Sequence, residues 1–154
     1  MINWDAIGAG AELIAAVAVI ATLVYLAVQI RQNTQSNQNT AIQTISGHKS
    51  EWLSLITQDS EVAALAVKGN ADYEALTVEE MLRFTTLFMH FYRLYETQYH
   101  LYLNSAVPND LWLGSSQTLQ FGLQGPGARL VWDQNRERFS PSFQTLVDEL
   151  LADT

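Results

Sequence analysis

The chain has three histidines, which are the first candidates for metal binding or acid–base chemistry. Glu96 and His100 are four positions apart, and His48 and Glu51 are three apart, so each pair shares one face of a predicted helix. Two such pairs on facing helices could hold a metal ion, as carboxylate and histidine side chains do in some helical bundles. Those sites use two Glu-x-x-His motifs and two further glutamates, of which only fragments occur here. We interpret these residues as polar side chains beside a core and predict no metal site.

No motif for nucleophilic or nucleotide chemistry is present. The chain has no cysteine, which excludes disulfides, thiolate metal sites and cysteine nucleophiles. Its serines lack the Gly-x-Ser-x-Gly turn of many hydrolases, and its glycine-rich run, Gly122 to Gly127, does not follow a predicted strand. We therefore predict no catalytic residue, no cofactor and no enzymatic activity. An enzyme or metal-binding bundle is the least supported alternative.

The charge of the chain restricts its partners. Eight basic and 16 acidic residues give a net charge of −8. A general nucleic-acid binder needs lysine and arginine to neutralise phosphates, and so does a polybasic lipid-binding surface. We therefore predict no nucleic-acid partner.

The most informative element is an apolar run near the N-terminus. From Ile7 to Ile30 the sequence has 24 residues without proline, and no charged residue follows Glu12 within it. At about 1.5 Å per residue these span roughly 36 Å, enough to cross a hydrocarbon layer of ~30 Å. The first residues lack the lysine or arginine of a cleaved signal peptide, and the run lacks the polar face of an interfacial helix. We predict a transmembrane helix with a short tail in residues 1–31, with a buried core helix as the alternative.

A stripe of residues on this helix alternates in spacing between four and three positions, which is the pattern of a helix that packs against parallel neighbours. Small residues in the membrane half of such a stripe allow backbones to approach closely, while the later members are polar. The sequence predicts a homo-oligomer, or association with other membrane proteins, through this association stripe. Its members are Ala11, Ala15, Ala18, Thr22, Tyr25, Gln29, Gln32 and Ser36, and the spacing continues through Asn39, Gln43 and Ser46.

Glu12 lies inside the predicted outer end of the membrane helix. A carboxylate is costly at the bilayer centre, so we expect Glu12 near the headgroups, or neutral and hydrogen-bonded between helices. The alternative is a ring of Glu12 side chains at the mouth of an oligomeric cation pore lined by Thr22, Gln29, Gln32 and Ser36. An ion channel is thus the alternative to our first hypothesis, a non-enzymatic scaffold or accessory subunit of a membrane complex.

Beyond the membrane helix the pattern is helical throughout, and it predicts an all-α fold in which the transmembrane helix extends into a helical-bundle soluble domain. Residues 32–48 form a polar helical extension or a linker, with Gly47 as a possible break. Residues 49–154 form the soluble domain. Its longest helix begins at Val78, after a capping box of Thr77 and Glu80, and runs to about Asn104.

Several segments along nearly the whole chain form a recognisable set. They are Trp4, Ala6-Ile7-Gly8, Glu12 and TLVYLAVQIRQNT, then Asp110-Leu111-Trp112, Pro126-Gly127-Ala128-Arg129-Leu130-Val131-Trp132 and Phe139-Ser140-Pro141-Ser142-Phe143. In these segments the chain resembles a widespread group of small bacterial proteins with one N-terminal membrane helix and a helical C-terminal domain. The resemblance implies the architecture and a bacterial source, and it implies no activity. With Arg31 directly after the membrane helix, the positive-inside tendency then predicts that the soluble domain lies on the cytoplasmic side of the bacterial inner membrane.

Overall fold

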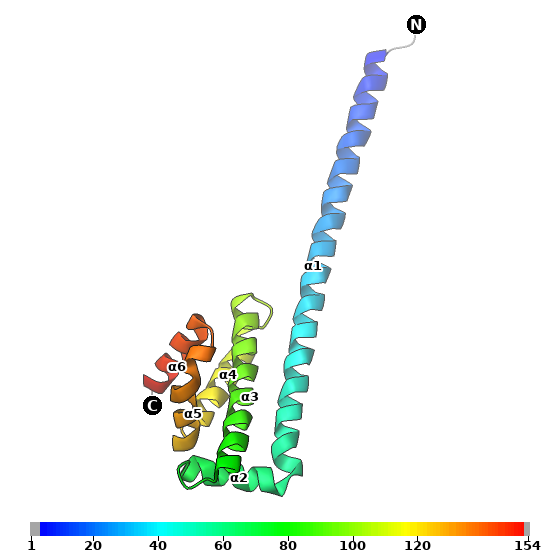
Figure 1. The fold of residues 1–154 in the computed structure, drawn as a ribbon. Helices are drawn as coiled ribbons and strands as arrows, with labels where there is room; N and C mark the ends of the chain where they lie inside the picture. Colours follow the sequence, from blue (N-terminus) through cyan, green and yellow to red (C-terminus); the bar gives the residue numbers. More distant parts are fainter. Residues whose placement is uncertain (1–3, 153–154) are drawn as a thin grey trace. The chain divides into compact units, whose positions relative to one another are not determined.

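The computed structural model describes the backbone of residues 4–152 and the side chains of residues 10, 12 and 14–152. Within this part of the chain every regular element is a helix and none is a strand, which confirms the all-α prediction (Figure 1). The elements are α1 (Trp4–Gln58), α2 (Ser60–Ala71), α3 (Val78–Leu103), α4 (Asn109–Gly122), α5 (Pro126–Asn135), the short 3-10 helix η1 (Arg136–Arg138) and α6 (Pro141–Ala152). The chain divides into two compact units, residues 1–39 and 40–154.

Helix α1 continues through the polar tract and through Gly47, so the predicted break at Gly47 is wrong. A glycine ends a helix when the chain must turn there, and Gly47 keeps helical geometry with open space around it. The helix ends instead at Gln58, because Asp59 adopts an extended conformation and its side chain accepts a hydrogen bond of 2.8 Å from the backbone N–H of Glu61. Residues 32–48 are therefore helical along their whole length.

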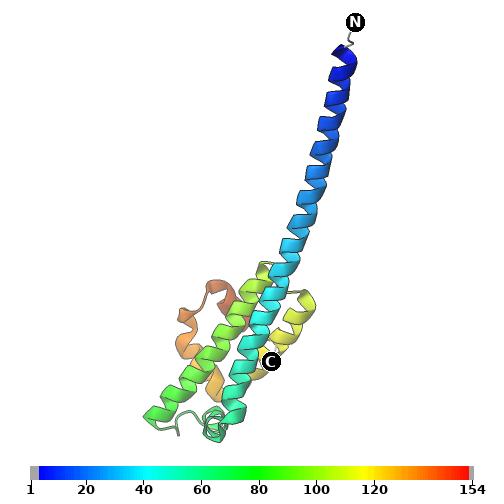
Figure 2. The same ribbon diagram turned by 90° about the vertical axis from the view of Figure 1, so that its right-hand side faces the viewer.

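In the second unit, α3 is the central helix. The last part of α1 and α3 run side by side and antiparallel, and α2 crosses one end of the bundle between them (Figure 1, Figure 2). Aromatic rings along α3 contact neighbours on several sides. Trp52 of α1 lies 5.1 Å from Phe91, centroid to centroid, and Trp132 of α5 lies 5.4 Å from Tyr92. Aromatic residues of α3 thus form a large part of the core.

The predicted capping box at the start of α3 is confirmed. Thr77 Oγ1 accepts from the N–H of Glu80, and the Glu80 carboxylate accepts from the N–H of Thr77 at 2.8 Å. The Lys68 ammonium and the Thr77 N–H lower the pKa of Glu80 to about 2. Glu80 therefore caps α3 and also connects α3 to α2, because its carboxylate forms an ion pair with Lys68 of α2.

Two glycines let α2 and α5 touch backbone to backbone. A Cβ on Gly127 would collide with the carbonyl oxygen of Gly69. With any larger residue at position 127, α5 could not pack this closely against α2. Next to this contact, Asn70 of α2 accepts a hydrogen bond of 3.0 Å through its Oδ1 from the N–H of Ala128, in the first turn of α5. Because Gly125, the residue before α5, has no side chain to cap the helix, α2 supplies the cap.

Candidate functional site

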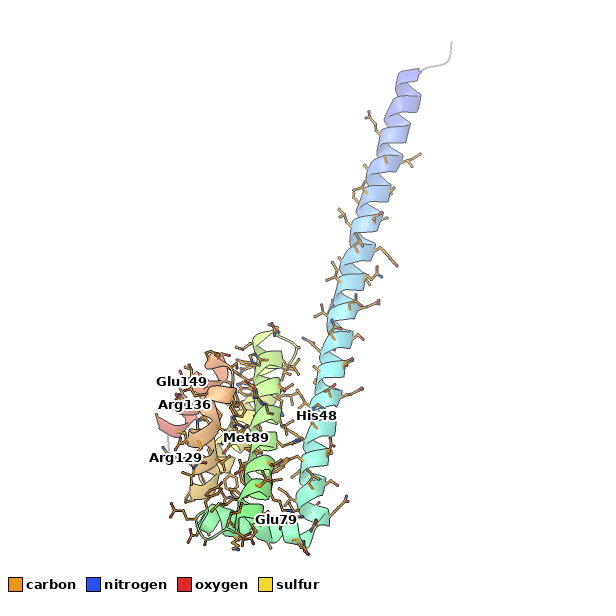
Figure 3. The ribbon with its side chains drawn as sticks, viewed as in Figure 1. His48, Glu79, Met89, Arg129, Arg136 and Glu149 are labelled. Atoms are coloured by element: carbon orange, nitrogen blue, oxygen red, sulfur yellow. The ribbon has the colours of Figure 1, made fainter. Side chains whose placement is uncertain are left out.

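The apolar part of α1 is uncovered. Every side chain from Ile14 to Ile30 is exposed, including Ile14 at 73% and Ile20 at 61%. The side chains of this segment project on all sides of the helix (Figure 3). Among the described residues, α1 is the one helix that is long and apolar enough to cross a membrane. The alternative of a buried core helix is disfavoured, because such a helix would have its apolar residues packed against protein.

The association stripe lies along one side of this helix. Successive residues of an α-helix are about 100° apart, so positions spaced by three and four fall on one face. Ala15, Ala18, Thr22 and the later members are all exposed, whereas the side chain of Ala11 lies outside the described residues. The hydroxyl of Thr22 donates to the carbonyl of Ala18 at 2.8 Å. This polar group is therefore satisfied within its own helix and can lie in an apolar surrounding.

Glu12 is exposed, but it is not a member of the stripe. At about 100° per residue, it lies roughly a quarter turn round the helix from the line through Ala15, Ala18 and Thr22. A pore lined by the stripe would hold Glu12 at its flank. The side chain of Trp4 lies outside the described residues.

Glu96 and His100 do meet, and what they bind is the start of α6. The Glu96 carboxylate accepts from the N–H of Ser140 at 2.7 Å, and His100 Nε2 shares a hydrogen bond of 3.0 Å with the Ser140 hydroxyl. Burial alone would raise the pKa of Glu96, but the N–H of Ser140 and the guanidinium of Arg93 outweigh it and lower that pKa. These side chains hold a helix terminus in place.

His48 and Glu51 lie elsewhere. They face a hollow of about 230 Å³ that His90 and Arg93 of α3 also line; His48 is labelled in Figure 3. Glu96 and His100 meet at Ser140, whereas His48 and Glu51 line this hollow, and Arg93 is a neighbour of both pairs. Within residues 4–152, no three acidic or histidine side chains gather in a way that could hold a metal ion.

An apolar hollow of the second unit lies along α3. It measures about 580 Å³ and is mostly apolar, with Trp52, Leu87, Phe91 and Phe121 among its lining residues. Ligand sites are commonly hollows of this size, but they also carry a few convergent polar groups. Among its lining residues, Asn70, Thr118 and Gln124 carry amide or hydroxyl groups, and the Asn70 Oδ1 already accepts from the N–H of Ala128.

A smaller hollow carries the polar groups that sequence reasoning missed. Lys49 of α1, Gln98 of α3 and Ser115 of α4 line it together. The sequence held one signal for it, because Lys49 is the first charged residue after Arg31. Only the fold shows that three helices converge there.

No protein-family model matches the sequence, and neither a curated protein nor a solved structure gives a match to it.

Proposed function

We propose that this chain is a single-pass, non-enzymatic membrane protein that associates through α1, either with copies of itself or as a small accessory subunit of a membrane complex. The observation that carries the proposal is the exposed apolar segment from Ile14 to Ile30. An apolar surface of this extent is unfavourable in water, and a lipid bilayer or other apolar helices would cover it.

The association stripe supports assembly in particular. In lipid, helices gain little by hiding apolar side chains from one another, so they associate where small residues permit close backbone contact. Ala15, Ala18 and Thr22 provide such a surface over two turns. Gln29, Gln32 and Ser36 continue it with polar side chains that can hydrogen-bond between helices.

We further propose that the helix lies in a bacterial cytoplasmic membrane with residues 40–154 inside the cell. Arg31 directly after the apolar segment supports this orientation. Because the chain has no cysteine, one introduced cysteine can report it. Glu74→Cys, at an exposed position between α2 and α3, should react with a membrane-impermeant maleimide only after the cells are lysed. Labelling of intact spheroplasts would contradict the orientation.

Assembly is tested by native mass spectrometry of the full chain in detergent, with Ala15→Leu and Ala16→Leu side by side. Ala16 is an exposed alanine that lies well away from the stripe. Ala16→Leu is therefore the control, because it adds the same side-chain volume to another face of the helix. We expect a discrete multimer for the wild type and for Ala16→Leu, and a smaller species for Ala15→Leu. A wild-type monomer would refute self-association and leave the accessory subunit, which a pull-down should then recover with its partner.

The ion-channel alternative differs in conductance. A scaffold predicts that Glu12→Gln changes neither the multimer nor the cation flux across liposomes. A pore with a ring of Glu12 side chains at its mouth predicts altered cation conductance. Flux in the wild type that Glu12→Gln alters would favour the channel.

A further inference from the structure

A hollow of about 120 Å³ lies between α1, α3 and α4, within the second unit. Four of its lining side chains are apolar: Ile42 and Ile45 of α1, Val107 just before α4, and Leu111 near the start of α4. A water molecule occupies about 30 Å³ in the liquid, so the hollow has room for roughly four groups of that size. The hollow is therefore large enough for a small molecule.

One wall of this hollow holds a buried amide without a partner. Gln98 is 1% exposed, and its Nε2 makes no hydrogen bond with any described residue. A buried donor left without an acceptor costs roughly 1–3 kcal/mol, so native proteins rarely keep one unless something binds there. This amide has two N–H groups to offer to a ligand.

The same hollow holds an ammonium without a carboxylate. Lys49 donates to Ser115 Oγ at 3.0 Å and lies 5.7 Å from the centre of the Tyr95 ring, and no acidic side chain of the described residues pairs with it. Ser115 in turn donates to the carbonyl of Leu111, so its hydroxyl is satisfied. Burial lowers the pKa of Lys49, as expected for a cation that has lost water and gained no anion.

These groups specify the ligand. A positive charge and amide donors call for an oxygen anion, and the apolar walls call for a short hydrocarbon chain. We propose that this hollow binds a free carboxylate of two to four carbons, with its carboxylate on Lys49 and Gln98 and its chain against Ile42, Ile45 and Leu111. The site is independent of the role proposed for the membrane helix.

The test is a titration of the full chain in detergent with sodium acetate, propionate and butyrate, at constant ionic strength. The readout is the side-chain amide resonance of Gln98 in ¹⁵N NMR spectra, identified by its loss in Gln98→Glu. We expect it to shift saturably, with a Kd on the order of 1 mM, the affinity open to a ligand of about five non-hydrogen atoms. Phosphate and 1-propanol should bind at least about tenfold more weakly, since one lacks the chain and the other the charge.

Two variants locate the site by calorimetry. Lys49→Met and Gln98→Glu should each weaken propionate binding by about tenfold or more, because each removes a charged or charge-assisted hydrogen bond. Lys68→Met, which removes an exposed lysine that pairs with Glu80, is the control and should bind as the wild type does. Circular dichroism shows that each variant is folded. Absence of propionate binding, unchanged binding in both site variants, or tighter binding of phosphate than of propionate would overturn the proposal.

Discussion

Replacing Gly127 by alanine tests whether the contact between α2 and α5 holds the soluble domain together. The new Cβ would overlap the carbonyl oxygen of Gly69 and come within 3.1 Å of the Cα of Asn70. Both obstacles are backbone atoms, so no rotation of a side chain relieves the clash. The two helices must separate, and the hydrogen bond from the N–H of Ala128 to Asn70 is lost as they do.

The size of the effect follows from three contributions. Forcing a methyl group into a packed contact costs about 1–3 kcal/mol. Leaving the N–H of Ala128, which is fully buried, without its acceptor costs a further 1–3 kcal/mol or so. Alanine favours the helix over glycine by at most about 1 kcal/mol. We expect the Gly127→Ala variant to lose roughly 1–5 kcal/mol of unfolding free energy, and its Tm to fall by about 4–20 °C.

The assay is thermal unfolding of the full chain in detergent, followed by near-ultraviolet circular dichroism and tryptophan fluorescence, because Trp132 lies in the core of this domain. Gly114→Ala is the matched control. Gly114 lies on an exposed face of α4, and a Cβ added there would meet nothing within 4 Å, so this change should leave Tm unchanged or raise it. Equal Tm values for Gly127→Ala and Gly114→Ala would refute the close-contact argument.

Two further predictions concern helix starts. Glu96→Gln should lower the unfolding free energy at neutral pH by about 1–2 kcal/mol, since the Ser140 N–H loses a charged acceptor. Because the folded state lowers the pKa of Glu96 from 4.5, this contribution is complete above that pH and is lost as the pH falls below it; Tm values of both proteins should therefore converge in acid, and a constant difference would contradict the assignment. Thr77→Ala should cost about 1 kcal/mol in urea unfolding by removing the cap of α3, whereas Thr77→Ser should restore it. Equal stability of the alanine and serine variants would show that the capping box with Glu80 contributes little.

The elements of this fold were largely predictable, because the signals for them are local. The absence of proline before residue 108, the capping box at Thr77 and the proline at the start of α6 each act within one or two helical turns. The error at Gly47 has the same origin. Glycine lowers helix propensity by about 1 kcal/mol but does not require a turn, and the flanking residues carry the helix through.

The sites were less predictable. Glu96 and His100 were paired correctly on one helical face, since i and i+4 spacing is a property of the helix itself. Their common partner, Ser140, lies 40 or more positions further along the chain, and no spacing rule connects it to them. In the sequence, Glu96 and His100 resemble a fragment of a metal site. In the fold, they bind Ser140 at the start of α6.

The sequence by itself determined the apolar membrane-length helix, its stripe of small and polar residues and the all-helical class, because each follows from side-chain type repeated at the helical period. Tertiary structure alone decided which polar groups lie together. Lys49, Gln98 and Ser115 belong to no motif in the sequence. Only the packing of three helices buries Gln98 and Ser115, partly buries Lys49 and places them around one hollow. Burial and proximity depend on contacts between distant segments, which no local pattern encodes.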